Sequence, residues 1–524
     1  MKIRSDIVRT YQALHTWTGI TTGLLLFIGF FAGALTMFQG SIQRWADMGT
    51  QQVTDHWPVL SSVKTDHLIQ RVVAKDVTAA KGFVLTLDGS QPPMSWDTAD
   101  SELGQTVLKR YASLDGDNLL LHQSEKNQLS KLIDELHRTA GIAGEMGHTY
   151  LGVYVLGIAA IAYFLALISG VIFLLPTLVR SFFALRQKRG RFRYLLDTHN
   201  LVGVASLPFH IIIALTVVVF AFHDLFYGGL MAVYDDQPLF ERQSPDAEVY
   251  QLSQLPSLQQ FIDLGQRELP DYQLQSIELL GLDTTQPMAR MAMQNPDRLM
   301  VNPQGDFLVV HPFTLAVGYN TSPTGPDSIW GRVVSSFFAL HFGSYGGDWT
   351  RWVYFLLGLA GAYLFYSGNL LWLEKRRQQK NYSEKILRNM TALTLGVSHG
   401  CIAGIAFSML LGRWFSAYGD INALYVWSYY LMFFACVGFA FWRTNEQLAQ
   451  TLKIVCGSLC LLMPLTSLIG WMIPALGLPV SHTFESWLLE MIALLFALIF
   501  LRSARADNQL RQSHMASAPQ AKAA

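Results

Sequence analysis

Charged residues are scarce in this sequence, and their scarcity excludes an ordinary water-soluble chain. Only 15% of the 524 residues are Asp, Glu, Lys or Arg, whereas roughly a quarter are charged in soluble domains. Basic and acidic residues balance at 38 each, so no basic excess is available to bind nucleic acid. Hydrophobic residues make up 51% of the chain. The composition therefore predicts a membrane protein with no nucleic-acid partner.

Cysteine is also rare, and sequence motifs for nucleotide binding are absent. All four cysteines lie in hydrophobic stretches of the last third of the chain, so they do not predict the disulfide framework of a secreted domain. The sequence contains no glycine-rich phosphate loop and no dinucleotide fingerprint. A direct reaction with NAD(P)H is therefore not indicated.

What the sequence has instead is a series of hydrophobic stretches that can cross a membrane. A helix needs about 20 apolar residues to cross about 30 Å of hydrocarbon. Eight stretches reach that length, near residues 17–38, 149–175, 200–226, 352–373, 392–411, 422–442, 453–473 and 484–502. The first lacks a small-residue cleavage site, so we interpret it as a retained anchor rather than a signal peptide.

The basic residues between these stretches predict their orientation. Lys and Arg cluster in residues 179–197, in residues 375–390 and after the last span. Short loops rich in Lys and Arg stay in the cytoplasm. Both termini are therefore expected in the cytoplasm of a bacterial inner membrane, and residues 40–147 and 228–348 in the periplasm. Both polar segments contain alternating hydrophobic residues and turn signals, as is typical of small α+β domains.

The expected fold is a membrane all-α helical bundle with eight spans and two small periplasmic α+β domains. The predicted segments are 1–39 (first span), 40–147 (first periplasmic domain), 148–178 (second span), 179–197 (basic cytoplasmic loop), 198–227 (third span), 228–348 (second periplasmic domain), 349–374 (fourth span), 375–390 (second basic loop), 391–503 (four further spans) and 504–524 (disordered cytoplasmic tail).

The first four spans contain an internal repeat. A His with a Gly two to four residues after it lies at or just before the start of each span. These residues occur in the segments Leu14–Gly19, Leu136–Gly141, Thr198–Gly203 and Leu340–Gly343. The second and fourth spans also end alike, with Ile168-Ser169-Gly170 and Tyr366-Ser367-Gly368. The chain is therefore predicted to contain a duplicated span–domain–span unit, followed by four extra helices.

The repeated histidines are the candidate functional residues. Polar groups at membrane depth are costly and usually functional, and two neutral imidazoles from facing helices suit a six-coordinate haem iron that transfers electrons. His15 and His199 lie at the cytoplasmic ends of their spans, and His137 and His341 lie just outside the outer boundary. The sequence therefore predicts two haem b groups, one held by His15 and His199, the other by His137 and His341.

Several other residues belong to this prediction. Glycines close to the histidines are expected to let a flat macrocycle approach the backbone; they are Gly19, Gly141, Gly203 and Gly343. The alternative ligands are His210, His223 and His148. His210 and His223 are thirteen residues apart, or about 20 Å along one helix, a spacing that also suits two stacked haems. A single histidine at a helix end is more often an interfacial or capping residue than a ligand.

These motifs resemble the PepSY-associated transmembrane proteins, a family that includes iron-regulated inner-membrane ferric-siderophore reductases. The resemblance covers residues 9–377 and rests on the four His–Gly segments, together with Gly144-Glu145, Gly147, Asp197, Gly346-Gly347, Ser367-Gly368 and Trp372. It implies a four-helix core that binds two b-type haems through paired histidines, with PepSY-like domains in the periplasm. Two departures are Thr216-Val217, where the family usually has Thr-Gly, and the four added spans.

The leading functional hypothesis is a transmembrane electron conduit. The resemblance implies reduction of a ferric siderophore or other ferric chelate in the periplasm, and the donor is expected to be a quinol or a flavin. Hard oxygen donors favour Fe(III) over Fe(II), so reduction would release the iron. Besides membrane lipid no other partner is indicated, and no residue is assigned to covalent catalysis. The alternatives are a non-redox membrane scaffold whose PepSY-like domains bind or regulate periplasmic partners, and an iron or chelate permease.

Overall fold

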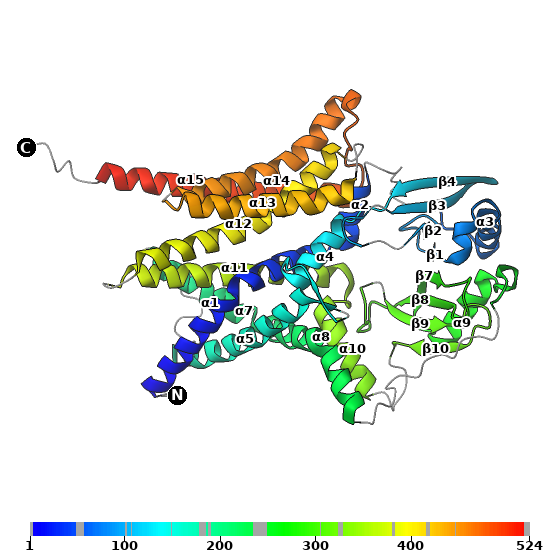
Figure 1. Ribbon diagram of the computed structural model, residues 1–524, viewed down its shortest axis with the longest axis horizontal. Helices are drawn as coiled ribbons and strands as arrows, with labels where there is room; N and C mark the ends of the chain where they lie inside the picture. Colours follow the sequence, from blue (N-terminus) through cyan, green and yellow to red (C-terminus); the bar gives the residue numbers. More distant parts are fainter. Residues whose placement is uncertain are drawn as a thin grey trace, which may run out of the picture. The chain divides into compact units, whose positions relative to one another are not determined.

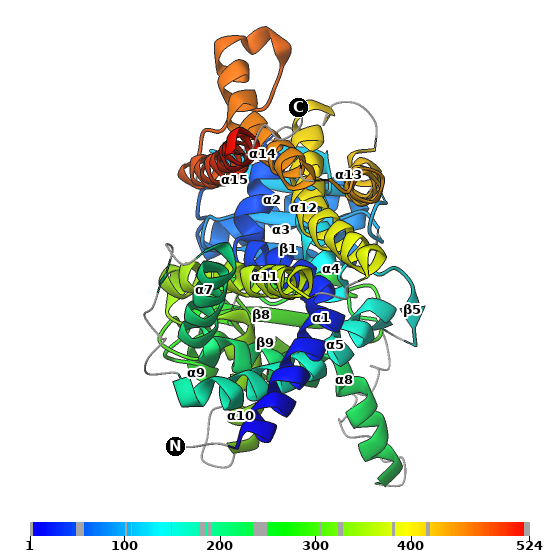
Figure 2. The ribbon, with the colours of Figure 1, turned by 90° about the vertical axis from the view of Figure 1, so that its left-hand side faces the viewer.

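The computed structural model describes thirteen stretches of the chain, which fold into two compact units. The stretches are residues 4–48, 57–99, 102–105, 107–147, 149–177, 185–186, 190–233, 249–303, 305–322, 329–379, 383–415, 420–445 and 447–517. The helical unit comprises Met1–Gln51, Asn127–Val218 and Phe355–Ala524. The sheet unit comprises Gln52–Lys126 and Val219–Tyr354. Figures 1 and 2 show the elements of both units, coloured along the sequence.

Eight helices in the described stretches are long and apolar enough to cross a membrane. They are α1 (Ser5–Thr36), α5 (Leu151–Leu174), α8 (Leu207–Val233), α11 (Gly347–Arg377), α12 (Glu384–Phe415), α13 (Ile421–Trp442), α14 (Leu448–Met472) and α15 (Phe484–Ser517). Two shorter helices, α2 (Gln39–Asp47) and α4 (Leu129–Thr139), occur between α1 and α5 in sequence. Each long helix overlaps one predicted span, so the prediction of a helical membrane protein is confirmed.

The third span differs from its prediction because its helix is interrupted. The stretch 200–226 was expected to form one helix, but the chain forms α7 (Arg191–Ala205) and then α8, with Ser206 between them. Proline has no N–H to donate, and its ring crowds the carbonyl group four residues earlier. Pro208 therefore cannot continue the helical hydrogen bonds of α7 into α8. As a result, His199 lies on α7, before the membrane-spanning helix.

The two polar segments form one continuous sheet rather than two separate small domains. Its eight strands have the order β10-β9-β8-β7-β1-β2-β3-β4, and neighbouring strands are antiparallel. The first segment contributes α3 (Ser62–Lys75), β1 (Phe83–Thr86), β2 (Met94–Asp97), β3 (Leu108–Asp115) and β4 (Asn118–Glu125). The second contributes α9 (Leu258–Glu268), β7 (Gln273–Leu280), β8 (Met288–Gln294), β9 (Asp306–Val310) and β10 (Val317–Asn320). Each segment therefore supplies a helix and a four-stranded meander, consistent with an internal duplication.

The pairing of β1 with β7 joins these two halves. Phe83 lies opposite Leu279 and Leu85 lies opposite Ile277, and all four side chains are at most 2% exposed. In an isolated half, β1 or β7 would be an open edge with unpaired N–H and C=O groups. Helices α3 and α9 pack against each other beside the sheet (Figure 1), so residues of both halves share one hydrophobic core.

The four added spans are joined to the duplicated core by hydrogen bonds. Helix α13 packs against α4, and α15 packs against α2. Asn127, just before α4, donates from Nδ2 to the Tyr425 hydroxyl at 2.9 Å. The neighbouring Gln128 N–H donates to Asn422 Oδ1, also at 2.9 Å. The added helices are therefore an integral part of the helical unit.

A buried ion pair also links the added spans to α2. Arg413 on α12 and Glu490 on α15 have side chains at most 3% exposed, and Nη1 and Oε1 are 3.4 Å apart. Glu490 accepts further hydrogen bonds from Ser467 and Ser481, and from Trp45 Nε1 on α2. Buried charges are tolerated when they are paired and hydrogen-bonded. Glu490 Oε1 meets that requirement, whereas Arg413 Nε has no hydrogen-bond partner among the described residues.

The β1–β7 junction predicts a specific weak point at Gly82. A Cβ added there would lie 2.5 Å from the carbonyl oxygen of Leu279, so Gly82→Ala should force the strands apart. Overpacking of this kind costs about 1–3 kcal/mol. Thermal unfolding of the purified protein should therefore show a lower midpoint. Gly228→Ala is the control, because its Cβ would meet nothing within 4 Å; equal midpoints for both variants would contradict the close approach.

Candidate functional site

His15 and His199 come together in the helical unit. His15 lies on α1 and His199 on α7, and their ring centres are 6.4 Å apart with an interplanar angle of 78°. Both side chains are half-buried. Two imidazoles bound through nitrogen at about 2 Å on opposite sides of one metal ion have ring centres about 6 Å apart. The observed separation therefore fits two ligands of a single ion.

Hydrogen bonds at Nδ1 orient both rings. His15 Nδ1 lies 2.8 Å from the Ala166 carbonyl oxygen, which can only accept, so Nδ1 carries the hydrogen. His199 Nδ1 lies 2.8 Å from Ser367 Oγ. That hydroxyl donates to the Leu364 carbonyl at 3.2 Å, so it accepts from His199. In both rings Nε2 therefore keeps its lone pair, which is the state that a metal ligand needs.

Glycines on neighbouring helices make room for these rings. A Cβ at Gly170 on α5 would lie 3.0 Å from His15 Nδ1, and a Cβ at Gly368 on α11 would lie 3.5 Å from His199 Cε1. These glycines belong to the two Ser-Gly pairs that end the second and fourth spans in the same way. The sequence repeat therefore corresponds to the same packing of a histidine on a glycine in both halves.

His137 is held on α1 by the same kind of contact. Its Nδ1 lies 2.8 Å from the Gly29 carbonyl oxygen, so Nδ1 donates and Nε2 keeps its lone pair. A Cβ at Gly33, one turn further along α1, would lie 2.5 Å from His137 Nδ1. Gly29 follows His15 by fourteen residues, or about 21 Å along the helix axis. One helix therefore carries His15 near one end and supports His137 near the other.

His341 lies in the sheet unit, near the end of α10 (Ile329–Phe342). Its ring centre is 5.0 Å from that of Phe220 on α8, with an interplanar angle of 74°. His137 belongs to the helical unit, so the pairing of His137 with His341 stays a prediction.

One known family matches most of the chain. Residues 12–375 match the family model described as the PepSY-associated TM region. The match covers more than half of the chain and includes all four repeated histidines. The chain belongs to the PepSY-associated transmembrane family. The match ends before α12, so the four added spans lie outside the family region. A search of curated proteins finds no match to the chain.

Among the alternative ligands of this PepSY-associated protein, His210 has the most unusual surroundings. Its side chain is fully buried on α8, and neither ring nitrogen has a hydrogen-bond partner within the described stretches. The ring centre of Tyr163 is 6.0 Å away, and its buried hydroxyl also has no partner there. Gly361 on α11 approaches the ring closely. Buried polar groups are rarely left unsatisfied, so these two side chains mark a place where a further polar group is expected.

The other two alternatives have different surroundings. His223 is exposed, and both ring nitrogens are engaged, Nδ1 with the Phe220 carbonyl oxygen at 2.7 Å and Nε2 with Asp224 Oδ1 at 3.0 Å. It is therefore not set up to bind a metal. His148 lies outside the described residues.

The glycines expected beside the histidines have other neighbours in the structure. A Cβ at Gly19 would meet nothing within 4 Å, and one at Gly203 would meet Leu364 alone. Gly141 lies against Leu136 and Tyr430, and Gly343 has a φ of 63° just after α10. The approach of a macrocycle at these four positions stays a prediction. The glycines in contact with the rings are Gly33, Gly170 and Gly368, of which the matching Ser-Gly pairs indicated the last two.

Asp197 lies in the middle of α7, two residues before His199, and ties Arg186, which precedes the helix, to it. Its carboxylate is 2% exposed and accepts from Arg186 at three positions, from Nη2 at 2.6 Å, from Nε at 2.9 Å and from the backbone N–H at 3.0 Å. Arg193 Nε lies 3.5 Å away. The hydrogen bonds from Arg186 hold the pKa of Asp197 below its ordinary value.

Asp197→Asn is expected to destabilise the protein at neutral pH, because it removes these charge-assisted hydrogen bonds. A lowered pKa means that the stabilisation is present above the ordinary pKa of 3.8 and is lost as the pH falls through the lowered value. Unfolding midpoints of wild type and variant should therefore differ at pH 7 and converge in acid. Asp6→Asn is the control, because its ion pair with Arg4 is exposed. Equal midpoints at pH 7 would show that the contact of Asp197 with Arg186 does not stabilise the protein.

Proposed function

We propose that this chain is a transmembrane electron-transfer protein that holds two haem b groups and reduces ferric chelates. The observation that carries the proposal is the His15–His199 pair, with ring centres 6.4 Å apart and both Nδ1 atoms hydrogen-bonded. When bound, haem b supplies one-electron transfer at an iron held by two imidazoles. The hydrogen bond at His137 Nδ1 leaves Nε2 available, so His137 is the proposed ligand of a second haem toward the other end of α1.

The chain's own residues would preorganise these histidine ligands. Ala166 and Ser367 fix the ring orientation of His15 and His199, and a hydrogen bond at Nδ1 also raises the basicity of Nε2. Gly170 and Gly368 leave the space that the rings occupy. The proposed reaction needs no covalent catalysis, because an electron-transfer site has only to position its ligands and bring the electron acceptor close to the haem.

The proposed direction follows from the charge distribution. The basic loops favour a cytoplasmic location for the His15 and His199 end in a bacterial inner membrane, and a periplasmic location for the sheet unit. The proposed donor is a quinol or a flavin, and the proposed acceptor is a ferric siderophore or another ferric chelate. A quinol that loses two electrons and two protons reduces two Fe(III) ions to Fe(II). Oxygen donors hold Fe(II) less tightly, so the iron is released.

The first test is a reduced-minus-oxidised visible spectrum with pyridine haemochrome quantification of the detergent-purified protein. About two low-spin haems b per chain are expected, and His15→Ala, His199→Ala, His137→Ala and His341→Ala should each lose about one. His311→Ala is the control, because that ring accepts local backbone hydrogen bonds from Phe313 and Thr314.

Two outcomes of this test would change the proposal. A well-folded preparation without haem, even after haem supplementation, would exclude the redox function and favour the scaffold over the permease as the remaining alternative. If His210→Leu loses a haem whereas His341→Ala does not, His210 and not His341 is the partner of His137 at the second haem. Haem ligation would then explain why the His210 ring nitrogens have no hydrogen-bond partner among the described residues.

Gly33→Ala provides an independent test of His137. The added Cβ would lie 2.5 Å from His137 Nδ1, so the ring would have to leave the Gly29 carbonyl. We expect the loss of one haem while the haem at His15 and His199 is kept. Gly23→Ala on the same helix is the control, because its Cβ would make an ordinary contact with Asn369 at 3.5 Å. Full haem content in both variants would argue against His137 as a ligand.

A further inference from the structure

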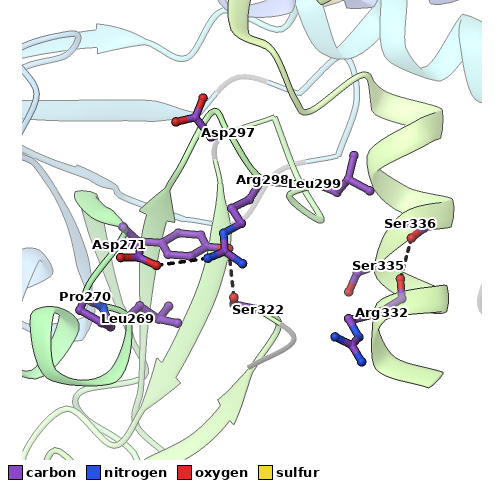
Figure 3. A pocket seen from close by; sticks show the side chains of 11 residues that line it. Leu269, Pro270, Asp271, Asp297, Arg298, Leu299, Ser322, Arg332, Ser335 and Ser336 are labelled. Carbon is purple, nitrogen blue, oxygen red and sulfur yellow. Dashed lines mark hydrogen bonds and ion pairs between the residues drawn. The ribbon is translucent and has the colours of Figure 1, made fainter. Parts of the chain in front are cut away.

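A partly open cavity of about 360 Å³, lined by both apolar and polar side chains, lies in the sheet unit. One wall is formed by α10, through Arg332, Ser335 and Ser336, and the other by the strand region, through Arg298 and Ser322. Figure 3 shows these two groups of side chains on opposite sides of the space. Ligand sites of proteins have volumes of about 300–1,000 Å³, so this cavity has room for a small ligand or for one face of a larger ligand.

The charges of the cavity favour an anion on the α10 side. Arg298 is paired with Asp271, with Nη2 and Oδ2 3.1 Å apart. Arg332 is exposed and forms no ion pair with any acidic residue that the structure describes. The other carboxylate of the lining, that of Asp297, points away from the space between the two arginines (Figure 3). Among the described residues the Arg332 guanidinium therefore has no carboxylate partner, and its planar array of donors matches carboxylate oxygens.

The same helix connects the cavity with His341. Ser336 and Arg332 precede His341 on α10 by five and nine residues, or about 8 and 14 Å along the helix axis. The opposite wall is tied to the chain just after His341. Ser344 Oγ donates to the Met300 carbonyl at 2.6 Å, and the Met300 N–H donates to the Ser344 carbonyl at 3.1 Å. Both walls of the cavity are therefore positioned relative to His341 within one unit.

We propose that this cavity binds the ferric chelate, and that Arg332 selects chelates with a net negative charge and with carboxylate or catecholate donors. The proposal rests on the proposed ferric-chelate reduction and names its substrate class and binding site. The Fe(III) in the cavity takes up one electron from the quinol or flavin donor proposed above and becomes Fe(II). A neutral or cationic hydroxamate chelate would gain less from the Arg332 guanidinium.

The test is isothermal titration of the full-length purified protein with ferric citrate and with gallium citrate. Gallium(III) has the same charge and donors as Fe(III) but is not reduced, so its binding is measured independently of electron transfer. Arg332→Gln is expected to weaken both by roughly tenfold or more. Ser336→Trp, which fills the cavity and keeps Arg332, should also weaken binding. The matched control is Arg351→Gln, an arginine outside the cavity that pairs with Asp348.

The outcomes separate this proposal from the function on which it rests. Three results would overturn the proposed site. The first is unchanged binding of gallium citrate by Arg332→Gln. The second is an equal dependence on Arg332 for a neutral ferric trihydroxamate, and the third is Arg332-dependent binding of glycerol phosphate in place of gallium citrate. If haem is present and chelates are reduced while Arg332→Gln changes neither binding nor KM, the site is wrong and the function stands. If gallium citrate binds through Arg332 but the protein holds no haem, the redox function is wrong and the anion site stands.

Discussion

The arrangement of the candidate site depends on one interaction, the hydrogen bond that the imidazoles of His15, His137 and His199 each make through Nδ1. At His15 and His137 the acceptor is a carbonyl group of another helix, and at His199 it is the Ser367 hydroxyl. This bond fixes the ring and leaves the lone pair on Nε2, so it provides both properties that a metal ligand needs. The close helix packing at Gly33, Gly170 and Gly368 follows from it, because a Cβ at these positions would crowd the rings.

The duplication in the sequence reappears at two levels of the structure. In the helical unit, the contact of the His15 ring with Gly170 corresponds to the contact of the His199 ring with Gly368. In the sheet unit, α3 with β1–β4 corresponds to α9 with β7–β10, and the two copies meet at β1 and β7. Joining the copies at these strands buries what would otherwise be two open edges. The two halves are therefore combined by strand pairing in one unit and by histidine contacts in the other.

The four added spans contribute to the position of His137, although they lie outside the region shared with the family. Asn422 and Tyr425 on α13 hydrogen-bond the residues that lead into α4, and Tyr430 donates to the Gly141 carbonyl just after α4 at 3.0 Å. Helix α4 carries His137 and packs against α1 and α5. The added helices thus hold both ends of the short helix that presents this histidine.

The sequence by itself determined the eight spans, the internal repeat and the histidines of the site, because hydropathy and repeated motifs are local properties of the chain. It also predicted that His15 and His199 meet, since equal depth in two copies of one unit leaves few other arrangements. Only the tertiary structure decided the joining of β1 to β7, the carbonyl groups of Ala166 and Gly29 as ring acceptors, and the cavity beside Arg332. These features bring together segments that are distant in the sequence, and packing in a shared core selects such contacts, which no local pattern encodes.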